Sequence, residues 1–174
     1  MQLPPLPLLF AALFATTLGF SAFACGSATV AAEGPGGNTT PGEGATASER
    51  SCLDLANAQR ERRASEPDQV HVKHLLVKHR DSRNPREGVT RSREEACARA
   101  LQLRDRVLGG ADFDELVSEA SDEPGAATRS GDLGSVKRSD LVPAFADAAF
   151  LLDLQQMSDV VETPFGFHLI VRVP

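Results

Sequence analysis

The chain contains the stretch Val72-Lys73-His74-Leu75-Leu76-Val77-Lys78-His79, and near its end lies a second one, Gly166-Phe167-His168-Leu169-Ile170-Val171. Both stretches alternate over β-branched and aliphatic residues, which predicts two strands. In each, a histidine falls among apolar residues, where its half-polar ring must be hydrogen-bonded or held for a task. If the strands are neighbours in one sheet, the rings of His74 and His168 can meet and hydrogen-bond. The alternative is two unrelated histidines, each satisfied separately.

The segments around these strands predict further elements. Ser92 and Glu95 form a capping box at the start of a helix, which Gly109-Gly110 ends. The expected elements, in chain order, are a strand at 70–79, helices from 92 to 109 and from 112 to 120, a loop at 121–130, a short strand starting at 131, a helix from 143 to 150, and strands at 158–163 and 167–173. This order predicts an α+β domain with a mainly antiparallel sheet.

The N-terminus predicts export. An uncharged, largely apolar run at 6–24 ends in Ala22-Phe23-Ala24, a small-x-small pattern, so we expect a signal peptide at 1–24. Three outcomes stay open. Cleavage after Ala24 gives a free secreted protein. Lipidation of Cys25, whose context loosely resembles a bacterial lipobox, gives a periplasmic, membrane-tethered lipoprotein. Without cleavage the run is long enough to remain as an anchor.

The rest of the chain divides into a tether and a domain. Residues 25–68 are rich in small and polar residues and predict a flexible tether with a short helix at 51–63, followed by one domain at 69–174. Cys52 and Cys97 could form a disulfide in an oxidising compartment, but we favour two unpaired thiols, with Cys97 packed as a small hydrophobe. Ligand spacing for a metal is absent from the sequence, and the net charge of −6 argues against nucleic acid. We expect a monomer.

Several motifs within residues 70–173 carry a family resemblance. They are, in order, His74-Leu75-Leu76-Val77, Phe113-Asp114-Glu115-Leu116, Ser121-Asp122, Gly131-Asp132-Leu133-Gly134, Phe145 with Ala148 and Phe150, and Gly166-Phe167-His168-Leu169-Ile170. With these motifs the chain resembles the parvulin-type peptidyl-prolyl cis-trans isomerases. The resemblance implies a βα3βαβ2 fold, activity on X-Pro bonds of proline-containing client segments, and no cofactor.

The resemblance also implies site residues. His74 and His168 match the family's paired histidines, Thr163 the hydroxyl beside the second one, and Glu123 the central cysteine or aspartate. The apolar walls that hold the proline ring match Leu133, Leu141 and Phe145.

The chemistry agrees with these roles. X-Pro bonds isomerise over a barrier of about 20 kcal/mol, and a ~10⁵-fold acceleration needs roughly 7 kcal/mol of transition-state preference. The bond twists without any covalent change, so we expect non-covalent, electrostatic catalysis in an apolar pocket. The rival interpretation is a proline-segment-binding chaperone module without turnover.

A basic loop follows the first strand. Lys78 and Arg83 match two of three cations that hold a phosphate before proline in one parvulin branch, whereas the third position is Asn84. Such cations could select an acidic residue before proline. Phosphate selection and a merely solvated basic loop are the alternatives, and Glu123 could instead occupy Lys78 in an internal ion pair.

Overall fold

The protein is described by a computed structural model over residues 47–174, with side chains from residue 51 onward. The expected signal peptide at 1–24, Cys25 and the tether up to residue 46 lie outside the described residues. None of the helices between residues 47 and 174 combines the length and apolar character that crossing a bilayer demands.

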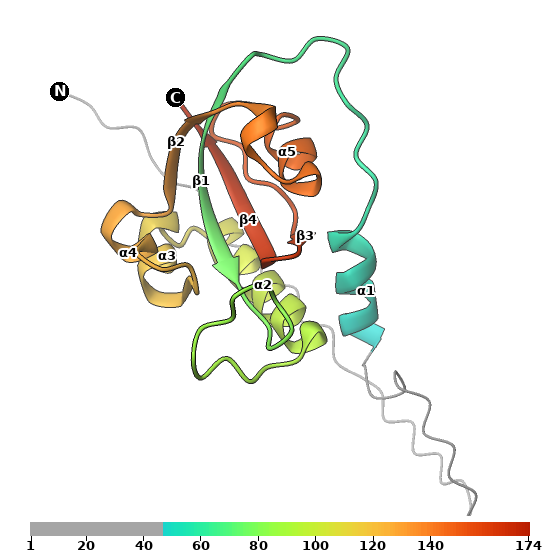
Figure 1. Cartoon of the computed structure of the whole chain (residues 1–174), viewed down its shortest axis with the longest axis vertical. Helices are drawn as coiled ribbons and strands as arrows, with labels where there is room; N and C mark the ends of the chain where they lie inside the picture. The colour runs from blue at the N-terminus through green and yellow to red at the C-terminus, as the bar shows by residue number, and fades with distance from the viewer. Residues whose placement is uncertain (1–46) are drawn as a thin grey trace, which may run out of the picture. The chain divides into compact units, whose positions relative to one another are not determined.

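The described chain forms an α+β domain around one antiparallel sheet. In chain order its elements are α1 (Ala47–Ala56), β1 (Val70–Val77), α2 (Arg93–Leu108), α3 (Phe113–Ala120), α4 (Ala126–Arg129), β2 (Asp132–Val136), the 3₁₀ turn η1 (Arg138–Asp140), α5 (Pro143–Ala149), β3 (Val161–Thr163) and β4 (Gly166–Val173). The strand order is β2-β1-β4-β3, with β1 and β4 in the middle (Figure 1). From β1 onward this is the expected βα3βαβ2 fold, so the predicted fold class is confirmed.

The two faces of the sheet contribute to separate apolar clusters. Successive residues of a strand point to opposite faces. Leu75 of β1 and Leu169 of β4 pack in a fully buried cluster with α2 and α3, whereas Val72 and Ile170 pack in a second cluster with α5. The residues between these positions decide what the second face does, because α5 covers only part of it.

Two expected boundaries after β1 were wrong. The predicted loop at 121–130 contains α4, a single turn bounded by left-handed Gly125 and Ser130. The predicted strand at 158–163 is regular only from Val161. Before it, after a turn at left-handed Gln155, the Ser158 amide donates to the Ile170 carbonyl and the Ser158 hydroxyl accepts from the Ile170 amide. Short turns of this kind have no periodicity long enough to be detected.

The segment before β1 also departs from expectation. The predicted helix at 51–63 is α1, which begins earlier and ends at Ala56. Cys52 and Ala56 are buried against α2, and Cys52 forms a disulfide with Cys97. Our preference for two unpaired thiols was therefore wrong. Residues 51–66, which belong to the expected tether segment at 25–68, contact the domain. Composition suggested a tether, but Cys52 and Ala56 on one side of α1 are buried, and the mostly exposed residues after them make polar contacts to the domain.

Two glycines allow their neighbours to approach β1 closely. A Cβ atom at Gly131 would lie 2.1 Å from the carbonyl oxygen of His74, and one at Gly166 would lie 2.5 Å from that of Val77. Both glycines also have a positive φ, which residues with a side chain rarely adopt. The Gly131 carbonyl in turn accepts a hydrogen bond of 2.9 Å from the His74 amide. β1 is thus held on both edges by positions that only glycine fits.

Candidate active site

The two histidines meet on the half-covered face of the sheet. His74 lies opposite Ile170 and His168 lies opposite Leu76, so the two rings are diagonal neighbours on β1 and β4. Their Nδ1 atoms are 3.2 Å apart, and the rings stack with centroids separated by 5.4 Å. Both side chains are almost fully buried. The alternative of two unrelated histidines was therefore wrong.

A chain of hydrogen bonds extends from this pair in both directions. His74 Nε2 lies 2.6 Å from Glu123 Oε2, and Arg129 pairs with the other carboxylate oxygen at 2.8 Å. At the opposite end, His168 Nε2 lies 2.8 Å from Thr163 Oγ1. Thr163 Oγ1 also accepts from the Phe165 amide at 3.1 Å. The four predicted catalytic side chains thus lie in one row, and Arg129 at its end is a member that the sequence did not suggest.

Two proton arrangements satisfy this row. In the first, Thr163 donates to His168, His168 donates to His74, and His74 donates to Glu123, with both rings neutral. In the second, His74 carries two protons, donates to His168 and to Glu123, and forms an ion pair with the carboxylate. His168 then donates to Thr163, whose hydroxyl turns to the Gly166 carbonyl 3.4 Å away. The two arrangements differ by one proton on the histidine pair.

The surroundings set the charges of the row. Burial, together with the positive charges of His74 and Lys78, holds the pKa of His168 well below its ordinary value, so His168 is neutral. Burial raises the pKa of Glu123, but the hydrogen bond from His74 and the nearby charges of His74 and Arg129 outweigh it, and the net pKa is lowered. Glu123 is therefore an ionised carboxylate at one end of the row, and His168 is a neutral imidazole within it.

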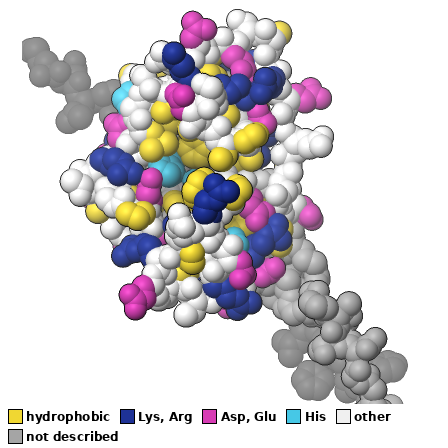
Figure 2. All heavy atoms as spheres, viewed as in Figure 1, with side chains coloured by type: hydrophobic (Ala, Val, Ile, Leu, Met, Phe, Trp, Pro, Cys, Tyr) yellow, Lys and Arg dark blue, Asp and Glu magenta, His cyan; other side chains and the backbone are white. Residues whose placement is uncertain are grey.

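An apolar pocket opens above the histidine pair. The cavity has a volume of about 540 Å³ and is lined on one side by Leu133, Leu141 and Phe145. The Phe145 ring stands nearly perpendicular to both imidazole rings, with centroid distances of 5.6 Å to His74 and 5.2 Å to His168. Figure 2 shows hydrophobic side chains gathered around a histidine in the middle of this face. Such a pocket accepts a compact apolar ring and excludes water from the groups beneath it.

Cations lie at one end of the pocket. Lys78 is buried, lines the cavity, and donates from Nζ to the Arg83 carbonyl at 2.9 Å. Burial lowers the pKa of Lys78, and the charges of Asp122 and Glu123 partly offset this. The Arg83 guanidinium lies 5.2 Å from the centre of the Phe165 ring, and Lys78 Nζ lies 5.9 Å from the same ring. The suggested ion pair between Lys78 and Glu123 is not formed, because the carboxylate turns to His74 and Arg129.

Asp122 positions Lys78, and the sequence did not predict this role. Its carboxylate accepts from the Lys78 amide at 2.9 Å and pairs with Arg91, which also donates to the Lys78 carbonyl at 2.9 Å. The Asp122 amide donates to the Leu76 carbonyl at 2.7 Å. The end of β1 is therefore fixed to the segment that carries Glu123. The Ser121-Asp122 motif was visible in the sequence, but its partner Arg91 was not.

Comparison with known proteins agrees with this geometry. A family model described as the PPIC-type PPIASE domain matches residues 56–173. The putative peptidyl-prolyl cis-trans isomerase dodo of Drosophila melanogaster is 44% identical over 111 residues, which cover 61% of this chain and 66% of that protein. Chaperone SurA of Methylococcus capsulatus is 44% identical over 101 residues, covering 58% of this chain and 20% of SurA.

Among solved structures, peptidyl-prolyl isomerase ESS1 from Candida albicans is similar to this chain with a TM-score of 0.59. The two are 34% identical, and the match covers 63% of this chain and 65% of ESS1. The chain thus spans about two thirds of the length of the fly and yeast proteins and one fifth of SurA.

Proposed function

The chain belongs to the PPIC-type peptidyl-prolyl isomerase family, the parvulins, and we propose that it catalyses cis-trans isomerisation of X-Pro bonds in polypeptide substrates. The observation that carries the proposal is the row Glu123–His74–His168–Thr163 at the base of an apolar pocket. An X-Pro bond changes isomer by twisting, without transfer of a proton or breakage of a bond. A pocket that grips the ring and fixes the polarity around the amide suits that task.

In the proposed mechanism, the proline ring sits among Leu133, Leu141 and Phe145 while the preceding carbonyl rotates. Twisting removes amide resonance, and that loss is easier when the amide leaves bulk water. The histidine pair and Glu123 present fixed dipoles and one fixed charge next to the twisting bond. Because their hydrogen bonds already exist in the free protein, they need no reorganisation during the reaction.

We further propose that the site prefers an acidic residue before proline. Lys78 Nζ has three protons, and its bond to the Arg83 carbonyl uses one of them, so donors remain for a substrate carboxylate. Arg83, over the neighbouring Phe165 ring, adds a second cation at the same end of the pocket. The ion pair with Glu123 that would have weakened this preference is not formed. Phosphate selection and a solvated basic loop are the competing outcomes.

One isomerase assay separates these outcomes. Glu-Pro, Ala-Pro and phosphoserine-Pro peptides are compared on the wild-type chain, on Lys78→Gln, and on Arg86→Gln as a control cation in the same loop. An acidic preference gives a higher kcat/KM for Glu-Pro than for Ala-Pro, and Lys78→Gln removes the difference. Equal rates for all three peptides would indicate a solvated basic loop without a role in selection. A higher kcat/KM for phosphoserine-Pro alone would indicate phosphate selection.

The rival function is a module that holds proline-containing segments without turnover. One relative, SurA, carries the name chaperone. The assay decides between the two, because a binder retains affinity for the peptide but leaves isomerisation at its uncatalysed rate. If the wild-type chain gives only that rate, the enzyme proposal fails.

We also propose that the protein is exported and works in an oxidising compartment. The apolar run at 6–24 followed by Cys25 supports export, and the Cys52–Cys97 disulfide supports an oxidising environment. Mass spectrometry of the full-length product from fractionated bacterial cells tests this. A free form cut after Ala24, a form lipidated at Cys25 and an uncut form have different masses. Uncut protein with two free thiols in the cytosol would overturn the proposal.

A further inference from the structure

The residues between α1 and β1 form a strap across the back of the site. We define the strap as residues 57–66. It leaves α1, passes along the side of α5 and leads over into β1 (Figure 1). Its partners are two elements that carry site residues, β3 with Thr163 and α5 with Phe145.

The strap contacts β3 directly behind Thr163. Asn57 donates to the Glu162 carboxylate at 2.6 Å, and Arg93 of α2 donates to the same oxygen at 2.6 Å. Side chains of adjacent strand residues point to opposite faces, so Glu162 faces away from the histidine that Thr163 contacts. The strap therefore restrains β3 from the side opposite the active site.

The strap contacts α5 in the same manner, through Arg138. Arg138 donates to both oxygens of Glu66, at 2.9 and 2.6 Å, and also pairs with Asp147 on α5. Residues two positions apart on an α-helix are separated by roughly 200° around its axis. Asp147, two residues after Phe145, therefore lies on the opposite side of α5. The Arg138 guanidinium also covers the Phe150 ring at 4.9 Å. One arginine thus joins the strap to the helix that forms the pocket wall.

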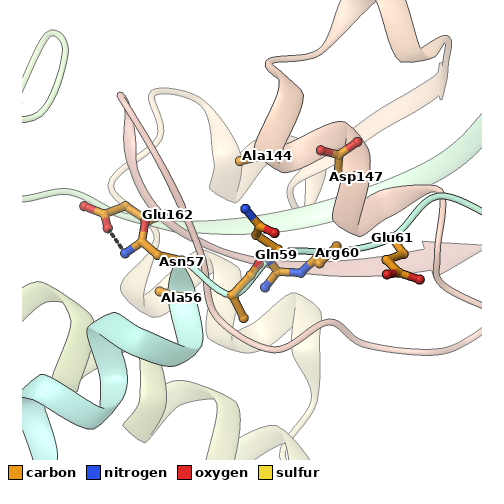
Figure 3. Close-up of a pocket in the computed structure, with 9 residues that line it drawn as sticks. Ala56, Asn57, Gln59, Arg60, Glu61, Ala144, Asp147 and Glu162 are labelled. Carbon is orange, nitrogen blue, oxygen red and sulfur yellow. Dashed lines mark hydrogen bonds between the residues drawn. The ribbon is translucent and has the colours of Figure 1, made fainter.

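Between these contacts the strap is not tightly packed. A cavity of about 360 Å³ separates it from α5 and β3. Figure 3 shows the Asn57–Glu162 bond at one end of this space and Ala144 and Asp147 of α5 along its side. The attachment is therefore polar, and partly exposed ion pairs hold weakly by themselves. Anchoring both ends of the strap, by the buried disulfide at Cys52 and by β1, keeps these weak partners at high effective concentration.

We infer that the strap is a brace that positions Phe145 and Thr163, with Glu66, Arg138 and Asn57 as positioning residues of the site. The inference rests on the proposed isomerase function. The two contacts act on different steps. The Glu66–Arg138–Asp147 contact supports the wall that grips the proline ring, so its loss raises KM. The Asn57–Glu162 contact supports the strand that hydrogen-bonds His168, so its loss lowers kcat.

The test compares Glu66→Gln with Glu119→Gln. Glu119 forms an equally bidentate pair with Arg106, at 2.9 Å for both bonds, but between α2 and α3. With an Ala-Pro peptide, Glu66→Gln should raise KM about threefold to tenfold at unchanged kcat, and Glu119→Gln should leave both constants alone. Simple loss of folded protein would lower kcat at constant KM, so a rise in KM cannot come from instability.

The second measurement is amide hydrogen exchange, which does not depend on turnover. Glu66→Gln should accelerate exchange at the Phe150 amide, which donates to the Ala146 carbonyl at the end of α5, and leave α2 amides protected. An unchanged KM in an active Glu66→Gln variant would overturn the brace. If the wild type itself does not catalyse, the proposed function fails, and equal α5 exchange in the two variants would then reject the brace separately.

Discussion

The two faces of the sheet are made from the same strands but have different roles. On one face, Leu75, Phe167 and Leu169 are completely buried beneath α2 and α3. On the other, α5 covers Val72 and Ile170, and the next positions along the strands are the two histidines at the open pocket. His168 has Phe167 and Leu169 as its direct neighbours in the chain. A single step along β4 therefore moves from core packing to site chemistry.

Strand alternation thus separates stability from function in this sheet. Substitutions on the covered face should change the free energy of unfolding, and substitutions on the open face should change the rate.

Phe167→Ala should destabilise the protein through the covered face. Phe167 is fully buried, and a truncation of this kind removes apolar contacts and leaves a cavity, at a cost of about 3–5 kcal/mol. Urea unfolding followed by circular dichroism measures it, since the chain has no Trp or Tyr. Under conditions where the variant is folded, KM should equal that of the wild type. A cost below about 1 kcal/mol would show that this face does not carry the stability.

The double variant His74→Leu, His168→Leu should do the reverse. Isomerisation should fall about a hundredfold, because the fixed dipoles beside the twisting bond are gone. Stability should change by less than about 1.5 kcal/mol, because both members of a buried polar pair are replaced together. Thr163 retains the Gly166 carbonyl and Glu123 retains Arg129 as partners. A large loss of stability at normal activity would show that the open face serves stability instead of catalysis.

Arg129→Ala should shift the pH dependence of the open face. Arg129 helps to lower the pKa of Glu123, so its removal raises that pKa toward the ordinary glutamate value. A carboxylate with a lowered pKa stays ionised until the pH falls through that pKa. The acidic limb of kcat/KM should therefore move to higher pH, by less than about one unit for a partly exposed pair. Arg104→Ala is the control, because Arg104 lies on α2 and pairs with Asp159 instead of a site residue. Identical acidic limbs for the wild type and Arg129→Ala would show that Arg129 does not act on the site.

Gln155→Gly should have the smallest effect, in a turn that belongs to neither face. Gln155 adopts a φ of 65°, where a side chain is unfavourable, while its amide donates to the Arg172 carbonyl at 2.7 Å. Glycine relieves the strain but gains freedom in the unfolded chain, so a net stabilisation of up to about 1 kcal/mol is expected. The unfolding midpoint should rise with unchanged kcat/KM, and a lower midpoint would show that Gln155 is not strained.

The sequence predicted the strands because their alternation is a local pattern. The pairing of His74 and His168, which are far apart in the chain, followed only from the family resemblance. The alternation of β1 and β4 and the capping box of Ser92 and Glu95, which the structure confirms, are readable within a few residues. The partners of Glu123 were not readable, because the loop through α4 decides whether its side chain turns to Lys78 or to His74. The disulfide and the strap were missed because they join segments whose separation in sequence carries no signal.

Gly131 and Gly166 have a consequence for large-scale mutagenesis. Neither glycine carries a side chain, yet any Cβ atom there would collide with the backbone of β1 beside His74 or Val77. In a saturation scan scored by activity, both positions would reject almost every replacement and would rank with His74 and His168. Intolerance at these two sites would record a shortage of space, not a chemical role. A second scan scored by abundance would separate the two classes, because the glycine variants should be depleted from the folded pool and the histidine variants retained.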